Sequence, residues 1–365
     1  MSDEDHMRAA LALARRGLGQ TSPNPSVGCV IVRHGRVVGR GFTAPGGRPH
    51  AEVQALTMAG EQALNGTAYV TLEPCSFVGQ SGACTEALIA AGVSRVVIGA
   101  KDPHPKVNGA GAARLRSAGI EVTEGVLQGP CEDVIAGFAS VQLARRPLVR
   151  LKLASSLDGR IATASGESQW ITGEPARREV HMMRSRHDAV MVGVGTVLAD
   201  NPDLTCRIEG VRAVPLVRVV IDSHLRTPML SKLVVGAKHH PLWILHRDGA
   251  DKFRRQALEQ VGVKLIELPF SPAGVNLSAA MRRLAEDGLT RLLVEGGGTL
   301  AAGLLRADLV DRLAWFHAPC VLGGDGFPAA QAFGVESLSQ MPRFRPVSAC
   351  RLGTDMLSHF TRVSV

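Results

Sequence analysis

Apolar and polar positions alternate along the first part of the chain in a way that predicts short strands and helices in turn. A short turn at His34 and Gly35 separates two runs rich in branched residues, which is typical of a hairpin. The expected strands are 27–32, 36–41, 67–72, 95–100 and 120–123, and the expected helices are 50–59, 85–91, 112–117 and 131–145. Alternation of this kind indicates an α/β fold.

The pattern stops at a short basic junction, residues 145–147, and starts again with an apolar strand at 148–154. Pro147 cannot continue a helix, so the preceding helix ends here. The chain has 365 residues, about twice the length of a typical single domain. We therefore expect two domains, 1–146 and 147–365.

Composition indicates sizeable cores and no secretion or membrane signal. Apolar residues make up 45% of the chain, and the N-terminus lacks the basic stretch and apolar core of a signal peptide. No apolar run approaches the roughly twenty residues that span a membrane. Seven cysteines, an odd number in a long chain, do not resemble a disulfide framework. We expect a cytoplasmic protein without a membrane partner.

The net charge of +8 would suit either a polynucleotide or phosphorylated small molecules. Basic residues are scattered along the chain, and aromatic residues, which would stack on bases, make up only 4% of it. We therefore expect no nucleic-acid partner. A phosphorylated substrate and the phosphates of a cofactor would use the same charge.

Three residues, His50, Cys75 and Cys84, are of the types that bind a catalytic zinc ion. One imidazole and two thiolates leave a fourth tetrahedral position for water. Glu52 lies two residues from a ligand, where it can accept a proton from that water and pass it to departing ammonia. This combination is typical of hydrolytic nucleobase deaminases.

The expected elements place these residues at junctions between strands and helices. Pro74 ends the strand before Cys75, His50 lies in the first turn of a helix, and Cys84 opens the next helix. The helix dipole favours a thiolate at that last position. Eight residues, 76–83, separate the two cysteines, whereas the general deaminase pattern has two.

The wide cysteine spacing resembles the bifunctional deaminase-reductases of riboflavin biosynthesis, and the segments 21–28 and 102–111 resemble the same family. This resemblance implies a cytidine-deaminase-like α/β/α sandwich that binds zinc and acts on a phosphorylated pyrimidine. The implied substrate-binding residues of this half are Asn24, Asp102 and Asn108. The chain departs from the family at Phe77 and at 81–83, which leaves the contacts of this loop open.

The second half contains two glycine-containing turns between a strand and a helix, within 189–202 and 291–306. In the second of them, Glu295 follows the strand 291–294, and the glycines at 296–298 open the helix. Backbone N–H groups of such a turn bind phosphate, and the helix N-terminus favours the anion. The turn fits the alanine form of the dinucleotide-binding fingerprint, and it fits an ordinary tight turn as well.

The resemblance to the same family decides between these alternatives. It covers 151–160, 166–172 and 200–207, and it implies a dihydrofolate-reductase-like α/β domain that uses NADPH, in place of a Rossmann fold. The implied cofactor-binding residues are Ala154, Trp170, Thr196, Asp200, Ser223, Gly297, Gly298, Thr299, Leu300 and Gly303. The implied residues that face the substrate are Ser168, Arg184, Leu204, Arg207 and Glu295.

General chemistry supports several of these assignments. The guanidinium groups of Arg184 and Arg207 suit a phosphate, because their parallel N–H groups match two of its oxygens. Trp170 can stack on nicotinamide. Lys152 lies in the expected strand beside the site, where it can protonate the sugar of the substrate as the ring opens.

We therefore expect a two-step enzyme. Its first domain deaminates 2,5-diamino-6-ribosylamino-4(3H)-pyrimidinone 5′-phosphate, and its second domain uses NADPH to convert the ribosyl group to ribityl. The resemblance also implies a homo-oligomer. Two alternatives remain: a deaminase that edits RNA or DNA and binds polynucleotides in a salt-dependent way, and a non-enzymatic module whose folding needs a structural metal ion.

Overall fold

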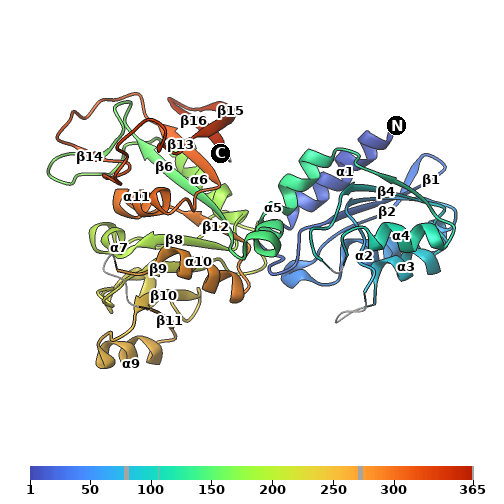
Figure 1. Ribbon diagram of the computed structural model, residues 1–365, viewed down its shortest axis with the longest axis horizontal. Coiled ribbons are helices and arrows are strands. Elements are labelled where there is room, and N and C mark those ends of the chain that lie inside the picture. Colours follow the sequence, from blue (N-terminus) through green and yellow to red (C-terminus); the bar gives the residue numbers. More distant parts are fainter. Residues whose placement is uncertain (78–81, 106, 270–273, 364–365) are drawn as a thin grey trace. The chain divides into compact units, whose positions relative to one another are not determined.

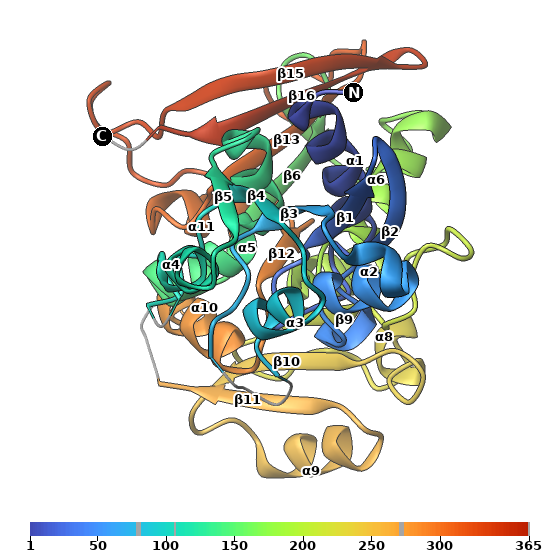
Figure 2. The same ribbon diagram turned by 90° about the vertical axis from the view of Figure 1, so that its right-hand side faces the viewer.

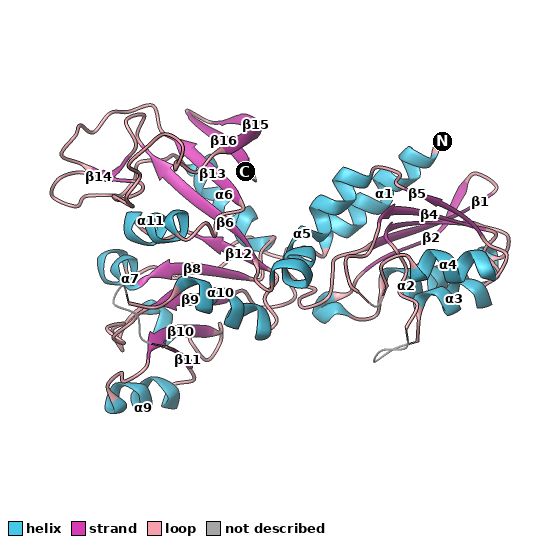
Figure 3. Cartoon of the chain, viewed as in Figure 1, coloured by secondary structure: helices cyan, strands magenta, loops and turns pink. Residues whose placement is uncertain are grey.

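The computed structural model describes residues 1–77, 82–105, 107–269 and 274–363. It contains two compact units, Met1–Arg145 and Arg146–Val365 (Figure 1). Arg146 belongs to the second unit because its guanidinium donates to both carboxylate oxygens of Asp311, at 2.6 and 2.7 Å. Both units combine helices with strands (Figure 3), which confirms the α/β class.

The first unit is built on a five-stranded sheet in the order β2-β1-β3-β4-β5. β1 pairs with β2 and β3 in antiparallel fashion, whereas β3, β4 and β5 are parallel. The strands are β1 (Gly28–Arg33), β2 (Arg36–Phe42), β3 (Thr67–Leu72), β4 (Arg95–Ala100) and β5 (Glu121–Glu124). His34 and Gly35 have positive φ and form the expected hairpin turn. The carboxyl ends of β3 and β4 lie side by side, since Leu72 pairs with Ala100.

Helices cover both faces of this sheet and form the expected α/β/α sandwich. α1 (Asp3–Arg16) and α5 (Gln128–Ala144) pack together on one face. The other face carries α2 (Ala51–Ala59), α3 (Cys84–Ala90) and α4 (Ala110–Ser117). Gly41 lets α2 lie directly on β2, because a Cβ at this position would clash with the carbonyl of Ala51. Two 3-10 turns, Pro45–Gly47 and Gly60–Ala63, flank α2.

The second unit is built on a nine-stranded sheet in the order β11-β10-β9-β8-β12-β6-β13-β16-β15. Neighbouring strands from β11 to β13 are parallel, and β16 and β15 complete the sheet as a long antiparallel hairpin (Figure 2). The strands are β6 (Leu148–Ser155), β8 (Ala189–Gly193), β9 (Val217–Ile221), β10 (Leu242–Arg247), β11 (Lys264–Leu268), β12 (Arg291–Val294), β13 (Arg312–His317), β15 (Phe344–Leu352) and β16 (Asp355–Arg362). A separate small sheet pairs β7 (Arg160–Ala162) with β14 (Phe327–Pro328).

Helices lie on both faces of the large sheet as well. α10 (Leu277–Glu286) and α11 (Gly298–Arg306) pack against one face, where Met191 of β8 points. The opposite face, where Val190 points, is covered by α7 (Val194–Asp200), α8 (Lys232–Val235) and α9 (Lys252–Gln260). α6 (Glu174–Ser185) packs on Leu293 and Phe316. Among the helices of the described residues, none is both long enough and apolar enough to cross a membrane.

Candidate functional site

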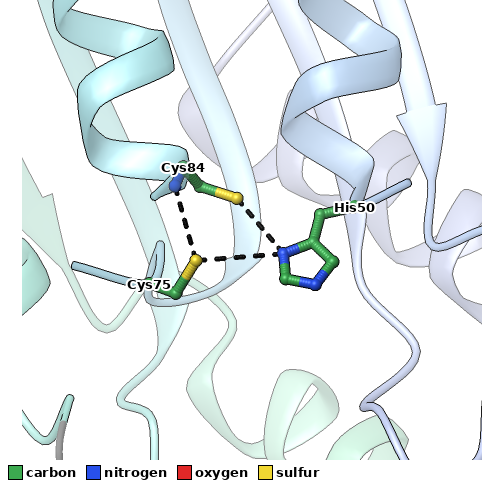
Figure 4. A group of neighbouring side chains, drawn as sticks. All are labelled: His50, Cys75 and Cys84. Carbon is green, nitrogen blue, oxygen red and sulfur yellow. Dashed lines mark hydrogen bonds between the residues drawn. The ribbon is translucent and has the colours of Figure 1, made fainter. Parts of the chain in front are cut away.

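Three side chains from separate elements converge beyond the carboxyl end of β3 (Figure 4). His50 directly precedes α2, Cys75 lies in the loop after β3, and Cys84 is the first residue of α3. His50 Nδ1 lies 3.3 Å from Cys84 Sγ and 3.8 Å from Cys75 Sγ. The three ligand atoms lie within 4.8 Å of one another, so they can share one zinc ion at bond lengths of about 2.0 to 2.3 Å.

The two cysteines of this group affect each other's acidity. Hydrogen bonds from Cys84, through its thiol and through its backbone N–H at 3.4 Å, lower the pKa of Cys75 to about 4. The same contact, together with burial, raises the pKa of Cys84. Contact with Cys75 also raises the pKa of His50. One thiolate is therefore ready before a metal binds, which suits zinc.

Glu52 is a buried carboxyl group beside these ligands. It is the second residue of α2, and only 4% of its surface is exposed. Burial raises the pKa of Glu52, and the negative charge of Cys75 acts in the same direction. A carboxyl group with a raised pKa exchanges protons more readily near neutral pH, as a general acid and base must.

The segment after β4 carries two of the expected substrate-binding residues, Asp102 and Asn108. We call its described part, residues 102–105 and 107–112, the substrate loop. The carboxylate of Glu73 accepts hydrogen bonds from the backbone N–H groups of Asp102, at 3.2 Å, and Gly109, at 2.9 Å. Burial raises the pKa of Asp102 to about 6, and the charge of Glu73 adds to this shift. The loop is thereby held beside the strand end that leads to the second zinc ligand.

Two further contacts bring other expected residues towards this region. The ring of Phe77 stacks on that of His104 in the substrate loop, with 5.6 Å between ring centroids. The family departure at Phe77 therefore lies next to the substrate loop, whereas residues 78–81, which hold part of the departure at 81–83, lie outside the described residues. Asn24 Nδ2 donates to the carbonyl of Gly47, three residues before His50, at 3.3 Å.

In the second unit, Arg184 of α6 and Glu295 after β12 form a largely buried ion pair. Arg184 Nε and Nη2 donate to the two carboxylate oxygens of Glu295 at 2.7 and 2.8 Å, and the side chains are 11% and 8% exposed. Arg184 Nη1 donates to the carbonyl of Thr205 at 2.8 Å. The paired N–H groups of Arg184, which were expected to bind a phosphate, thus bind Glu295. Arg184 also connects the loop around Thr205 to the residue that follows β12.

Arg207 differs from Arg184 because its side chain is 65% exposed, with Nη2 at 4.0 Å from Asp203. Its backbone N–H donates to His181 Nδ1 at 3.3 Å. In the same loop, Leu204 is buried and has a φ of 60°. Sequence reasoning missed His181, although its position one turn before Arg184 on α6 could have suggested it.

Lys152 lies on β6, the neighbour of β12 in the sheet, near Glu295. Burial lowers the pKa of Lys152, and Glu295 opposes this shift. The ammonium nitrogen lies 5.5 Å from the centre of the Phe316 ring. Burial raises the pKa of Glu295, but the charges of Arg184 and Lys152 outweigh burial, so the pKa is lowered. Burial and the charge of Arg184 together outweigh the carboxylate of Glu295, so Lys152 releases its proton more readily than an ordinary lysine.

The glycine turn before α11 is where the sequence predicts a phosphate-binding turn. Gly297 donates its N–H to Thr196 Oγ1 at 3.2 Å, which joins the turn to the start of α7. Gly297 is also the residue that precedes α11, and it has no side chain with which to cap the helix. Free N–H groups at a helix N-terminus suit a phosphate. Of the remaining expected residues, Gly298, Thr299, Leu300 and Gly303 lie in α11.

The other expected cofactor-binding residues lie at or beyond the carboxyl ends of parallel strands. Ala154 is near the end of β6, Thr196 follows β8, and Ser223 follows β9 and accepts a hydrogen bond from Val275 N–H at 3.1 Å. Asp200 ends α7 and accepts a hydrogen bond from Ser168. Trp170 is exposed, with the Arg177 guanidinium 4.6 Å from its ring centre. Ligands of parallel α/β sheets bind at such strand ends, so these residues fit a cofactor.

Known proteins match the chain over both halves. Residues 1–100 match the cytidine and deoxycytidylate deaminase zinc-binding region, and residues 147–358 match the RibD C-terminal domain. The chain is 42% identical to the riboflavin biosynthesis protein RibD of Escherichia coli K12, over 98% of this chain and 99% of that protein.

Solved structures agree with this match. RibD of Acinetobacter baumannii superposes with a TM-score of 0.88 at 37% identity, over 99% of each chain. A diaminohydroxyphosphoribosylaminopyrimidine deaminase/5-amino-6-(5-phosphoribosylamino)uracil reductase from Thermotoga maritima superposes with a TM-score of 0.86 at 33% identity, over 99% of each chain.

The fold and the sites define a zinc-binding deaminase joined to a dihydrofolate-reductase-like reductase. The chain belongs to the RibD family, the bifunctional deaminase-reductases of riboflavin biosynthesis, which act on phosphorylated pyrimidine intermediates. Its cofactors are zinc, bound by His50, Cys75 and Cys84, and NADPH. The predicted fold, family, enzyme class and cofactors are confirmed. The non-enzymatic alternative is wrong, and full-length similarity favours a biosynthetic over an editing deaminase.

Proposed function

We propose that the first unit, expected at 1–146 and ending at Arg145, forms the deaminase domain of this enzyme, and that the second unit, expected at 147–365 and beginning at Arg146, forms its reductase domain. The first acts on 2,5-diamino-6-ribosylamino-4(3H)-pyrimidinone 5′-phosphate and releases ammonia. The second uses NADPH to convert the ribosyl group to ribityl, which gives 5-amino-6-ribitylamino-uracil 5′-phosphate. The convergence of the three zinc ligands beside a buried Glu52 carries the first assignment. The substrates named for the Thermotoga maritima relative support both.

In the deaminase domain, Glu52 moves the protons of the reaction. Zinc, when held by its three ligands, is a Lewis acid that makes water a stronger nucleophile. The Glu52 carboxylate accepts a proton from the attacking water and returns it to the exocyclic amine as the C–N bond breaks. Water supplies the oxygen of the new carbonyl group, its second proton passes to the neighbouring ring nitrogen, and the amine leaves as ammonia. The raised pKa of Glu52 suits the return of the proton to the amine.

The substrate of the deaminase is held by Asn24, Asp102 and Asn108. Asp102 uses one carboxylate oxygen to accept the N–H of His104 at 2.7 Å, and the other oxygen can accept an N–H group of the pyrimidine. Two contacts support this assignment: Asn24 bonds to Gly47, three residues before His50, and the backbone of Asp102 bonds to Glu73, two residues before Cys75.

In the reductase domain, NADPH supplies the hydride for the sugar carbon that is attached to nitrogen. The turn at Gly297 binds a cofactor phosphate through its N–H groups. Lys152 donates the proton that the sugar oxygen takes up when the ring opens. The remaining cofactor-binding residues are Ala154, Trp170, Thr196, Asp200, Ser223, Gly298, Thr299, Leu300 and Gly303.

The substrate side of the reductase site consists of Ser168, Arg184, Leu204, Arg207 and Glu295. Arg207 binds the substrate phosphate, since its exposed guanidinium can turn towards an anion. Arg184 and Glu295 keep the loop of Arg207 in place through their mutual pair and the bond to Thr205. On this side of the site, Arg207 thus binds the substrate, whereas Arg184 and Glu295 position the loop that carries it.

We further propose that the chain works in the cytoplasm as a homo-oligomer. Its seven cysteines are free, as expected under reducing conditions. β15 is the outermost strand of the large sheet and is exposed along its middle, so a second copy can pair with its edge. Light scattering is expected to give a mass of at least two chains of 38.6 kDa each. A single-chain mass at micromolar concentration would contradict this.

Glu52→Gln tests the deaminase assignment. An amide cannot accept the proton of water, so we expect ammonia release to fall by at least about a hundredfold while the zinc content stays unchanged. NADPH oxidation with the deaminated intermediate should keep its wild-type rate, because that reaction belongs to the other domain. Wild-type ammonia release in this variant would reject the proposed role of Glu52.

A further inference from the structure

We propose that Glu73 is a positioning residue of the deaminase, whose carboxylate holds the substrate loop where Asp102 and Asn108 reach the pyrimidine. The inference rests on the proposed function, because that function gives the loop its substrate contacts. Glu73 itself touches neither the reacting atoms nor, by this proposal, the substrate.

The carboxylate of Glu73 is saturated by backbone groups of one short segment. Oε2 accepts the N–H groups of Asp102 and Gly109 at 3.2 and 2.9 Å. Oε1 accepts those of Gly111 and Ala112 at 2.9 and 3.2 Å. The side chain is buried, with 3% of the residue surface exposed. Four hydrogen bonds to one ionised group make a strong attachment, since bonds to charged groups exceed neutral ones.

Two of these N–H groups, those of Gly111 and Ala112, belong to the first turn of α4, and a third belongs to the residue directly before the helix. The N–H groups of a first helical turn have no partner within the helix, and the residue that precedes α4, Gly109, has no side chain to offer. Glu73 supplies the missing acceptor from the segment that follows β3, and its negative charge faces the positive end of the helix dipole. A Cβ at Gly111 would clash with the carbonyl of Pro74, so the helix start lies directly on the residues beside Cys75.

The same three residues, 73–75, also carry a zinc ligand. Glu73 N–H donates to the carbonyl of Ala100 at 2.9 Å, which continues the pairing of β3 with β4. Cys75 accepts the N–H of Thr85 at its carbonyl, at 3.2 Å, and the N–H of Cys84 at its sulfur. One rigid segment therefore sets the distance between the zinc ion and the substrate loop. If the loop is released, Asp102 and Asn108 lose their fixed positions for binding the pyrimidine, so substrate binding weakens first.

Glu73→Gln is the direct test. Glutamine has one acceptor oxygen in place of two and turns an NH2 group towards backbone donors, so two of the four N–H groups lose their partner. The matched control is Glu86→Gln. Glu86 of α3 also contacts α4, through Arg114 at 2.8 and 3.0 Å, but both side chains are exposed and no backbone group of the loop is involved.

The test uses several measurements on the zinc-loaded full-length chain. They are KM and kcat for ammonia release, the zinc content, and hydrogen exchange of the peptide that covers the substrate loop. We expect Glu73→Gln to raise KM roughly tenfold, with a smaller change in kcat, and to speed exchange at the start of α4. Zinc content and NADPH oxidation with the deaminated intermediate should match the wild type, as should every property of Glu86→Gln.

An unchanged KM with unchanged exchange would overturn the proposal, and so would loss of zinc with an intact loop, which would make Glu73 a support of the metal site. If Glu73→Gln does not fold, Glu73→Asp is used for the same test. Aspartate keeps the charge but is shorter and reaches fewer of the N–H groups, so its KM should lie between that of the wild type and the tenfold increase expected for Glu73→Gln. If the wild type releases no ammonia from this substrate, the proposed function is wrong. Hydrogen exchange then still decides whether Glu73 holds the loop.

Discussion

At the scale of single residues, the reductase site places two positive charges around one carboxylate. Arg184 already neutralises Glu295 through two hydrogen bonds, and the charge of Lys152 faces that same carboxylate. Burial of such a charge costs stability, which is consistent with the lowered pKa of Lys152. The buried amine of Lys152 therefore fits a role in proton transfer better than a role in stabilising the fold.

Lys152→Met should therefore separate activity from stability. We expect NADPH oxidation with the deaminated intermediate to fall by about a hundredfold or more, because the proton donor is gone. The melting temperature should stay equal or rise, since the Arg184–Glu295 pair remains balanced. In the wild type, the rate should fall as pH rises through the pKa of Lys152, which lies below that of an ordinary lysine. Retained activity or a clear loss of stability would contradict the assignment.

Sequence reasoning succeeds for residues whose type already specifies their chemistry. His50, Cys75 and Cys84 were predicted as zinc ligands because imidazole and thiols in this order have few other uses together. Glu73 and its loop could not be paired in advance, because its partners are backbone groups 29 to 39 residues away and any residue carries an N–H group.

At the scale of elements, the first helix is fastened to the sheet by a polar cluster. Asp3 at the start of α1 accepts hydrogen bonds from Arg95 of β4, at 3.0 and 2.8 Å, and from the hydroxyl of Tyr69 of β3, at 2.9 Å. The hydrogen bonds from Arg95 lower the pKa of Asp3. A helix that begins on the sheet in this way is held at its first turn as well as by its apolar face.

Asp3→Asn should lower the free energy of unfolding of the first unit by about 1 kcal/mol at neutral pH. Because the folded pKa of Asp3 lies below 3.8, the stabilisation is present above that pH and is lost as pH falls through the folded value. The difference between the two proteins should therefore shrink in acid. Urea unfolding followed by circular dichroism measures it, with Glu4→Gln, which removes only an exposed pair with Arg8, as the control. Equal effects of the two substitutions would reject this role of Asp3.

The tryptophans provide an internal reference for this measurement. All three, Trp170, Trp243 and Trp315, lie in the second unit. The transition seen by tryptophan emission should therefore stay the same in Asp3→Asn. A shift in that transition would show that the change reaches beyond the first unit.

The predicted bounds were most accurate for buried strands that lie between polar, glycine or proline residues. The expected ranges 67–72, 95–100 and 291–294 coincide with β3, β4 and β12. Two helices start two or more residues earlier than expected. α5 begins at Gln128 because Pro130 fits the first turn, where its missing N–H is not needed. α4 begins at Ala110, two residues early, because a carboxylate from the segment that follows β3 caps it.

At the scale of the whole molecule, the sequence supports a division into two parts and the class of each. The restart after Pro147 comes from local pattern, whereas the dihydrofolate-reductase-like fold of the second half was implied by family resemblance. Local pattern indicated a dinucleotide-binding turn there, because a glycine turn between a strand and a helix looks alike in both folds. Strand order, with β15 and β16 added antiparallel at one edge, depends on contacts between distant residues and was out of reach.

The hydrophobic clusters of the described residues each draw on one unit. The first contains residues from Met7 to Ile135, and the other three contain residues from Val149 onwards. Changes at positions that share no neighbours add independently in their effect on stability. A mutation that loosens the packing of one unit should therefore leave the stability of the other unchanged. Evolution can alter the activity of either unit without a compensating mutation in the other.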